Sequence, residues 1–322
     1  MSASTPFPLR LRVAAKSVAA EGVAAFRLVG EPGQSLPGFA AGAHVDVQME
    51  PGLVRQYSLC NPSAAPVDYE IAVLKEPASR GGSRFMHDSL IVGAELCASL
   101  PKNHFALVEG ASAVLLAGGI GITPLLAMAQ ELAAQERAFE LHYCARSPAR
   151  AAFMARLSRS LFADRVHFHF DDGPADQRLD MPAVLANAGT EYHLYVCGPG
   201  GFIEHVLTAA RQAGWPEARL HREFFTAPTT SASASIFEIE LAHSGRRLTV
   251  PADKTVLEIL TAAGIDVPAS CEAGVCGTCM TRVIGGTPDH RDVYLTEAEH
   301  ARNDCFTPCC SRACSPRLVL DL

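Results

Sequence analysis

The 322-residue sequence has no long hydrophobic run, no basic excess and no secretion signal. Its longest apolar stretch, around residues 111–129, is interrupted by glycines and a proline, well short of the roughly 18 apolar residues of a membrane span. The net charge of −7 argues against a nucleic-acid-binding protein, which would carry a basic face. Residues 1–8 are short and polar, unlike a signal peptide. These absences predict a cytoplasmic protein that binds neither nucleic acid nor membranes.

The sequence also lacks a tandem repeat and a convincing hydrolytic triad. What it does have is an ordinary globular composition, with 48% hydrophobic and 19% charged residues. Its length suits two or three domains.

Residues 1–108 predict an antiparallel β-barrel. Short β-branched or alternating runs are separated by proline and glycine, which is typical of such barrels. The expected strands are residues 9–13, 23–28, 44–48, 56–59 and 69–73.

Residues 109–226 predict an α/β domain with a parallel sheet, because apolar strands alternate with helical patterns. A helical bundle with short buried segments is the alternative. The expected strands are residues 113–117, 139–144, 165–170 and 193–197, and the expected helices are residues 124–137, 149–160, 181–188 and 201–213.

The small, uncharged residues 227–235 have the composition of a linker, and residues 236–322 predict a third, α+β domain. Its expected elements are a hairpin of residues 236–241 and 247–250, a helix at 255–263 and a strand at 317–322.

Cysteine is abundant and unevenly placed. The chain has 11 cysteines, an odd number that argues against a disulfide framework, and they crowd toward the C-terminal domain. Cys271, Cys276 and Cys279 form a C-x4-C-x2-C loop, the spacing of plant-type [2Fe–2S] ferredoxins. A zinc site would instead pair two C-x2-C motifs. By spacing, the candidates for the fourth ligand are Cys305, Cys309, Cys310 and Cys314.

Gly274 and Gly277 lie inside this loop, where glycine permits a positive φ and lets backbone amides approach the cluster sulfurs. A zinc-binding interaction or sensing module is the rival hypothesis for this domain.

A glycine turn, Gly118, Gly119 and Gly121, follows an apolar strand and precedes a helix. It is not a G-x-G-x-x-G motif, but its amides and the helix N-terminus suit a pyrophosphate. Thr123 is expected to cap that helix, with Pro124 at its first position. Cys197, Gly198 and Pro199 end a later strand at the same carboxyl edge.

Five sequence motifs, in this order along nearly the whole chain, resemble those of the phthalate dioxygenase reductase family. They are RQYSL at 55–59, RGGS at 80–83, GGIGITP at 118–124, CGP at 197–199 and the cysteine loop, with the fourth-ligand segment PCCSRA at 308–313. The family comprises the reductase components of two-component Rieske oxygenases, vanillate O-demethylase reductases included. The resemblance implies a flavin barrel, an NAD domain and a ferredoxin domain, with Cys309 as the fourth iron ligand.

The resemblance implies a flavin site on the barrel, and the order of domains implies FMN. Arg55 would pair with the phosphate, Tyr57 would contact the flavin ring and ribityl chain, and Ser58 would donate toward N5. Gln56 belongs to the same stretch, and Gly81, Gly82 and Ser83 are expected to hold the phosphate with backbone amides. An Arg-Gln-Tyr-Ser stretch alone is more often an ordinary exposed strand.

The resemblance also places Cys197 beside the nicotinamide and Phe225 on the flavin where the nicotinamide enters. Their alternatives are a small buried thiol and a core aromatic. Arg146 and Ser147 are expected to face the adenosine ribose, and Asp172 to accept from a ribose hydroxyl. An acidic group there favours NADH over NADPH, although Arg146 acts in the opposite direction.

The resulting hypothesis is an oxidoreductase that passes a hydride from NADH to FMN and then single electrons through a [2Fe–2S] cluster. The expected acceptor is a Rieske oxygenase of an aromatic dioxygenase or O-demethylase, docked transiently. A general NADH-dependent reductase serving a carnitine-type monooxygenase or ferric iron is the alternative.

Overall fold

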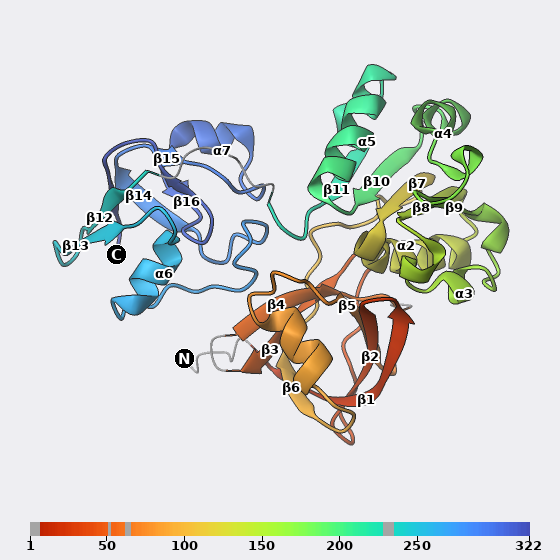
Figure 1. The fold of residues 1–322 in the computed structure, drawn as a ribbon, viewed down its shortest axis with the longest axis horizontal. Coiled ribbons are helices and arrows are strands. Elements are labelled where there is room, and N and C mark those ends of the chain that lie inside the picture. Colours follow the sequence, from red (N-terminus) through yellow and green to blue (C-terminus); the bar gives the residue numbers. More distant parts are fainter. Residues whose placement is uncertain (1–6, 51–52, 62–65, 228–234) are drawn as a thin grey trace. The chain divides into compact units, whose positions relative to one another are not determined.

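The computed structural model describes residues 7–50, 53–61, 66–227 and 235–322, and the chain forms two compact units, Met1–Glu223 and Phe224–Leu322 (Figure 1). The predicted linker at residues 227–235 falls outside the described residues, apart from its two ends. The predicted boundaries at residues 108 and 226 remain predictions. Among the described residues, no helix is both long enough and apolar enough to cross a membrane.

A six-stranded antiparallel sheet forms the first part of unit Met1–Glu223, in the order β4-β3-β6-β1-β2-β5. Its strands are β1 (Leu9–Ala20), β2 (Val23–Gly30), β3 (His44–Glu50), β4 (Leu53–Ser58), β5 (Tyr69–Leu74) and β6 (Glu95–Ala98). Along β1, Leu9, Leu11 and Val13 are buried while the intervening arginines are exposed, the alternation of a strand with one face on a core. The two edge strands β4 and β5 also approach each other, which curls the sheet into the predicted barrel (Figure 1).

A five-stranded parallel sheet forms the rest of this unit, in the order β11-β10-β7-β8-β9. Its strands are β7 (Ala113–Gly118), β8 (Phe139–Ala145), β9 (Val166–Phe170), β10 (His193–Cys197) and β11 (Leu220–Glu223), and its helices are α2 (Ile122–Ala134), α3 (Met154–Leu157), α4 (Met181–Ala188) and α5 (Gly200–Gln212). The chain winds from β7 outward to β9 and then returns to place β10 on the other side of β7. This reversal makes the carboxyl ends of β7 and β10 the switch point, where ligands bind in sheets of this kind.

One predicted helix of this domain is wrong. Residues 149–160 form a short turn at Pro148–Arg150 and a four-residue α3, separated by Phe153 in a left-handed conformation with φ 60°. Ala151 and Ala152 are buried in the core. Tertiary packing of these two alanines outweighs their high helix propensity.

The second unit is built on a mixed sheet in the order β13-β12-β18-β14-β16. Its elements are β12 (Phe237–Leu241), β13 (Arg247–Val250), α6 (Val256–Ala262), β14 (Thr281–Gly285), α7 (Glu297–Arg302), β16 (Cys305–Phe306) and β18 (Arg317–Leu320), with a separate pair β15 (Pro288–Asp289) and β17 (Arg312–Ala313). The predicted hairpin, helix and last strand are confirmed. Both helices begin with a capping box, Thr255 with Glu258 and Thr296 with Glu299, which fixes where they start.

Candidate functional site

The turns after β7 and β10 touch each other through their backbones. A Cβ atom built on Gly121 would lie 2.2 Å from the carbonyl oxygen of Cys197 and 2.6 Å from the amide nitrogen of Gly198. A Cβ on Gly198 would lie 2.9 Å from the Cα of Gly118. Only glycine permits this approach, so these residues are required by packing at the switch point as well as by any nucleotide bound there.

The helix after the glycine turn begins earlier than the sequence predicts. A 3-10 turn at Gly119–Gly121 leads directly into α2, whose first residue is Ile122 and whose preceding residue is Gly121. Thr123 is buried in the first turn and its hydroxyl donates to the carbonyl of Ile120 over 3.0 Å. The prediction that Thr123 caps the helix with Pro124 at its first position is therefore wrong, because the 3-10 turn at Gly119–Gly121 starts the helical winding sooner.

The helix after the second turn also begins at this edge, since α5 follows Pro199 directly. Two helix N-termini, those of α2 and α5, thus lie after neighbouring strands of the sheet. The 3-10 turn before α2 and the first turn of α5 follow no earlier helical turn, so their amides and positive dipoles suit phosphate groups.

Cys197 at the end of β10 has a partner that the sequence did not reveal. Glu223 lies directly opposite it at the end of β11, and the Cys197 Sγ atom is 3.9 Å from Glu223 Oε2. Burial raises the pKa of Glu223 to about 8 and, together with the nearby carboxylate, raises that of Cys197. Near neutral pH the pair is therefore protonated and uncharged. The four-residue strand β11 has no sequence pattern that could have drawn attention to Glu223.

The residues expected near the adenosine lie at the same carboxyl edge. Arg146 and Ser147 follow β8, and Asp172 follows β9. The amide of Asp172 donates to the carbonyl of Arg146 over 3.1 Å, so the two loops are joined. Both side chains are exposed, which leaves the guanidinium and the carboxylate accessible to a ligand.

On the barrel, the side chain of Arg55 lies against the glycine turn at the start of α1 (Gly82–Arg84). A Cβ on Gly82 would lie 2.6 Å from Arg55 Cγ, and the guanidinium donates to the carbonyl of Arg80 over 3.0 Å. Gly81 has φ 96°, a conformation that favours glycine. The structure thus brings together the arginine and the glycine turn that the sequence assigned to one phosphate, and this arrangement fits the anion.

The neighbouring residues of β4 alternate between its two faces. Tyr57 shares a face with Arg55, and burial raises the pKa of its hydroxyl. Gln56 points the other way, where its amide donates to Asp46 over 2.9 Å, so its side chain is committed to β3. Ser58 is buried at the end of the strand. The hydroxyl of Ser83 accepts from the amide of Glu76 over 3.1 Å, which anchors the glycine turn.

Phe225 belongs to the second unit, just after the division at Glu223, and is 36% exposed. Its exposure leaves the ring open to a contact, and its flavin-stacking role stays a prediction.

The four cysteines predicted to bind the cluster form two pairs of interacting thiols. Cys271 interacts directly with Cys276, which raises the pKa of Cys271 and lowers that of Cys276. Cys279 interacts in the same way with Cys309 and raises the pKa of Cys309 to about 12. Two pairs of thiols are what the two irons of a [2Fe–2S] cluster require. The donor set therefore fits the cluster.

The backbone around these thiols supports the same assignment. The amide of Ala273 donates to Cys271 Sγ over 3.3 Å, and the amides of Gly274 and Thr278 donate to Cys309 and Cys276. Gly277, with φ 67°, lies under Tyr294, where a Cβ would be 2.2 Å from the ring. Amides directed at sulfur stabilise a negatively charged cluster.

The remaining C-terminal cysteines are placed differently. Cys310 Sγ lies 3.2 Å from the hydroxyl of Thr307, Cys305 is on β16, and Cys314 is exposed. Cys310 also contacts Cys309, so it is the one serious competitor for the fourth position.

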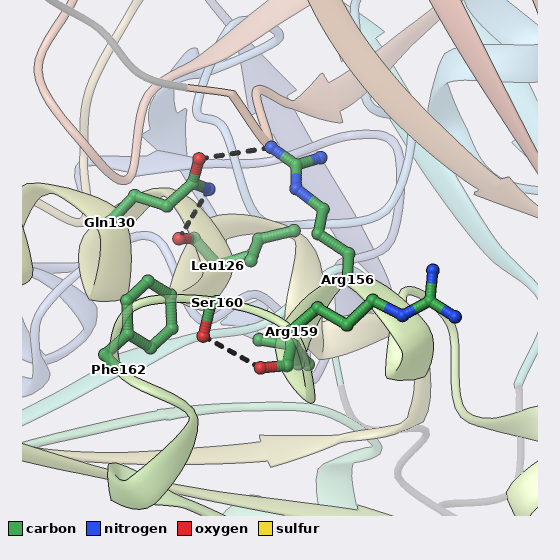
Figure 2. Close-up of a pocket in the computed structure, with 7 residues that line it drawn as sticks. Leu126, Gln130, Arg156, Arg159, Ser160 and Phe162 are labelled. Carbon is green, nitrogen blue, oxygen red and sulfur yellow. Dashed lines mark hydrogen bonds between the residues drawn. The ribbon is translucent and has the colours of Figure 1, made fainter.

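A pocket of about 380 Å³ between α2 and α3 lies apart from these sites (Figure 2). Arg156 on its wall is already bound to Gln130 over 3.1 Å and to Glu70 over 2.6 Å. None of the predicted site residues lines it.

Two turns suited to nucleotide phosphates and a set of four cysteine thiols in one chain suit a reaction in which electrons arrive in pairs and leave singly. The class that they define is a flavin and iron–sulfur oxidoreductase.

The comparisons with known proteins agree. A 2Fe-2S iron-sulfur cluster binding domain matches residues 239–314, and the N-terminal domain of dimethylamine monooxygenase subunit DmmA-like proteins matches residues 98–220. Vanillate O-demethylase oxidoreductases of Pseudomonas sp. (strain HR199 / DSM 7063) and Pseudomonas putida are 55% and 52% identical, each over 96% of this chain and 98% of the relative. The solved structure of phthalate dioxygenase reductase superimposes with a TM-score of 0.80 at 38% identity, over 98% of both chains.

The chain belongs to the phthalate dioxygenase reductase family and is an oxidoreductase, as the sequence motifs predict. The predicted fold class, a barrel with a parallel-sheet domain and a ferredoxin domain, is confirmed by the same likeness.

Proposed function

We propose that the chain is the NADH-dependent reductase of a two-component Rieske-type O-demethylase, with FMN and a [2Fe–2S] cluster as its cofactors. The observation that carries the proposal is the pairing of four cysteines in the same chain as the glycine-lined switch point. The vanillate O-demethylase oxidoreductases match almost end to end, which favours an aromatic O-demethylase as the acceptor. Docking to the oxygenase would be transient, because a reductase must leave between electrons.

The residues of this chain bind and orient the cofactors. Arg55 and the Gly81–Ser83 turn would hold the FMN phosphate, with Tyr57 and Ser58 along the flavin. The helix N-termini after Gly121 and Pro199 would hold the NADH pyrophosphate. Cys271, Cys276, Cys279 and Cys309 would hold the cluster. When bound, flavin and cluster convert a two-electron donor into a source of single electrons.

Cys197 and Glu223 would form an uncharged wall beside a bound nicotinamide. An uncharged wall avoids a buried negative charge beside the hydride donor, and Glu223 holds its proton at the carboxyl up to a pH of about 8. Phe225 completes the proposal as the aromatic cover of the flavin. Asp172, exposed after β9, would accept from the ribose hydroxyl of NADH and repel a 2′-phosphate.

We also place the protein in the cytoplasm. None of the 11 cysteines forms a disulfide in the described residues, which is typical of proteins from a reducing compartment.

The test is an anaerobic titration of the purified protein with NADH, followed by visible absorbance and low-temperature EPR. We expect bleaching of a flavin band together with the rhombic signal of one reduced [2Fe–2S] cluster. Flavin reduction without a cluster signal would refute the electron path. Adding the oxygenase component of an O-demethylase, with NADPH and a carnitine-type monooxygenase as comparisons, then tests the donor and the acceptor.

A further inference from the structure

Three histidines and a glutamate gather on one face of the parallel sheet. Glu140 and His142 alternate along β8, and His167 and His169 alternate along β9, so each pair projects to one side of its strand. His142 and His167 are directly opposite each other in the register. One ligand atom from each of Glu140, His142 and His167 lies within 4.8 Å of the others. None of the four belongs to the sites described above.

The hydrogen bonds around these side chains fix which nitrogens carry protons. The carbonyl oxygen of Gln177 can only accept, so His169 Nδ1, 3.2 Å away, is the donor. In a neutral ring, His169 Nε2 then carries no proton, and it accepts a hydrogen bond from His142 Nδ1 over 3.1 Å. The other ring nitrogen of His142, Nε2, is therefore also unprotonated, and it lies 3.3 Å from Glu140 Oε2.

Two acceptors therefore face each other with no proton between them. Neutral imidazole is the form in which histidine binds a metal ion. Two facing lone pairs repel each other unless a cation lies between them.

We propose that Glu140, His142 and His167 bind a divalent first-row metal ion, with Zn²⁺ as the ion that the ligands suit best. Two neutral imidazoles and a carboxylate are zinc ligands, whereas Mg²⁺ and Ca²⁺ prefer sites made of oxygen. His169 is a positioning residue: by accepting from Nδ1 of His142 it keeps Nε2 free to coordinate. Three protein ligands leave one position for water.

The site would link β8 to the edge strand β9, and through Gln177 to the segment that follows β9. Asp172 follows the same strand, so a bound ion would brace the loops that carry Asp172 and Arg146. An ion that binds the folded chain and not the unfolded one raises its melting temperature.

The experiment is a calorimetric titration of the holoprotein with ZnCl₂ at pH 7.5, after brief chelation that leaves flavin and cluster absorbance unchanged. We expect one ion to bind, with Glu140→Gln and His167→Gln each weakening the affinity at least about tenfold. His169→Gln should weaken it less. Glu140 and His167 have exposed or half-buried side chains, so these variants should fold. His205→Gln, an exposed histidine on α5, is the matched control.

Melting temperature provides a second measurement. Zn²⁺ should raise it in the unmodified protein and in His205→Gln, and should leave it unchanged in Glu140→Gln and His167→Gln. Absence of binding in the unmodified protein would overturn the proposal. So would binding that neither variant weakens, which would assign the ion to the thiols. Activity with NADH is measured separately, so failure of this site and failure of the reductase function are distinguishable.

Discussion

The buried carboxyl of Glu223 has a pKa that bears directly on the charge of the site. It lies opposite Cys197, and burial raises its pKa from the ordinary glutamate range to about 8. A group whose pKa is higher in the folded protein favours folding while it is protonated. That contribution is complete below the pKa of the unfolded chain, near 4.5, and is lost as the pH rises through about 8.

Replacing Glu223 by glutamine should therefore flatten the dependence of stability on pH. Between pH 6 and pH 9 the melting temperature of the first unfolding transition should fall in the unmodified protein and fall less in Glu223→Gln. Scanning calorimetry at intervals of half a pH unit measures this. Glu204→Gln, at an exposed position on α5, is the control. Equal slopes in all three proteins would show that Glu223 is ionised throughout.

A second prediction at the same scale concerns adjacent thiols. Cys309→Ser should abolish the visible absorbance and EPR signal of the cluster, because Cys309 is paired with Cys279. Cys310→Ser should retain both, since Cys310 interacts with Thr307. Cys314→Ser, at an exposed position, controls for the loss of a thiol. The reverse result for the first two variants would move the fourth ligand to Cys310.

Site residues could be identified from the sequence where only one type of amino acid can perform the role. Cys271, Cys276 and Cys279 are of this kind, because only thiolates at that spacing can wrap an iron–sulfur cluster. Glu223 could not be identified, because its role depends on a strand partner 26 residues away. The histidine cluster on β8 and β9 was missed for the same reason, since strand register brings it together.

At the scale of elements, the contact between two turns makes a sharp prediction. In Gly121→Ala the new methyl group would meet the backbone of Cys197, although φ at this residue is −63° and suits alanine. The turns must separate, and the KM for NADH should rise about tenfold or more, because displacements on the order of 1 Å are costly in a site. Steady-state kinetics measures this.

The control for that variant is Thr208→Ala, at an exposed position of α5 away from its N-terminus. Its KM should be unchanged, and flavin and cluster absorbance should be normal in both variants. A normal KM in Gly121→Ala would mean that the turns are not part of the nucleotide site.

Elements with strong local patterns were predicted closely, and those that depend on partners were not. The helix at residues 181–188 has the predicted bounds, because Asp180 caps it and Pro182 suits its first turn. The strands β6 and β11 have four residues each and were missed. They are strands because neighbouring strands pair with them, in registers that no local pattern encodes.

At the scale of the whole molecule, the division after Glu223 predicts a separable reductase. Unit Met1–Glu223 has its own hydrophobic cores in the barrel and around the parallel sheet. A chain of residues 1–227, which keeps Phe225, should bind FMN and reduce ferricyanide with NADH. It should not reduce the oxygenase component. Stopped-flow absorbance measures both, and failure to retain flavin would show that the second unit is needed for folding of the first.

The order of the three folds along the chain could be predicted from composition and motifs. Each fold has a characteristic hydrophobic periodicity and a characteristic spacing of glycine and proline residues. The order of strands within each sheet could not be predicted. Local sequence does not determine which strands become neighbours. The sequence predicted that the two glycine turns share the carboxyl edge of the sheet, and the structure then showed that the strand order reverses beside β7.

The place of β18 has a consequence for biosynthesis. This strand, Arg317–Leu320, is the middle strand of the second unit's sheet, between β12 and β14, yet it follows all four cluster cysteines in the sequence. A ribosome translates those cysteines before the strand that completes their scaffold. Iron insertion should therefore be a late event. A chain truncated before residue 317 should contain all four cysteine ligands but lack the central strand of the sheet that positions them. Pulse labelling with radioactive iron during translation would show the delay.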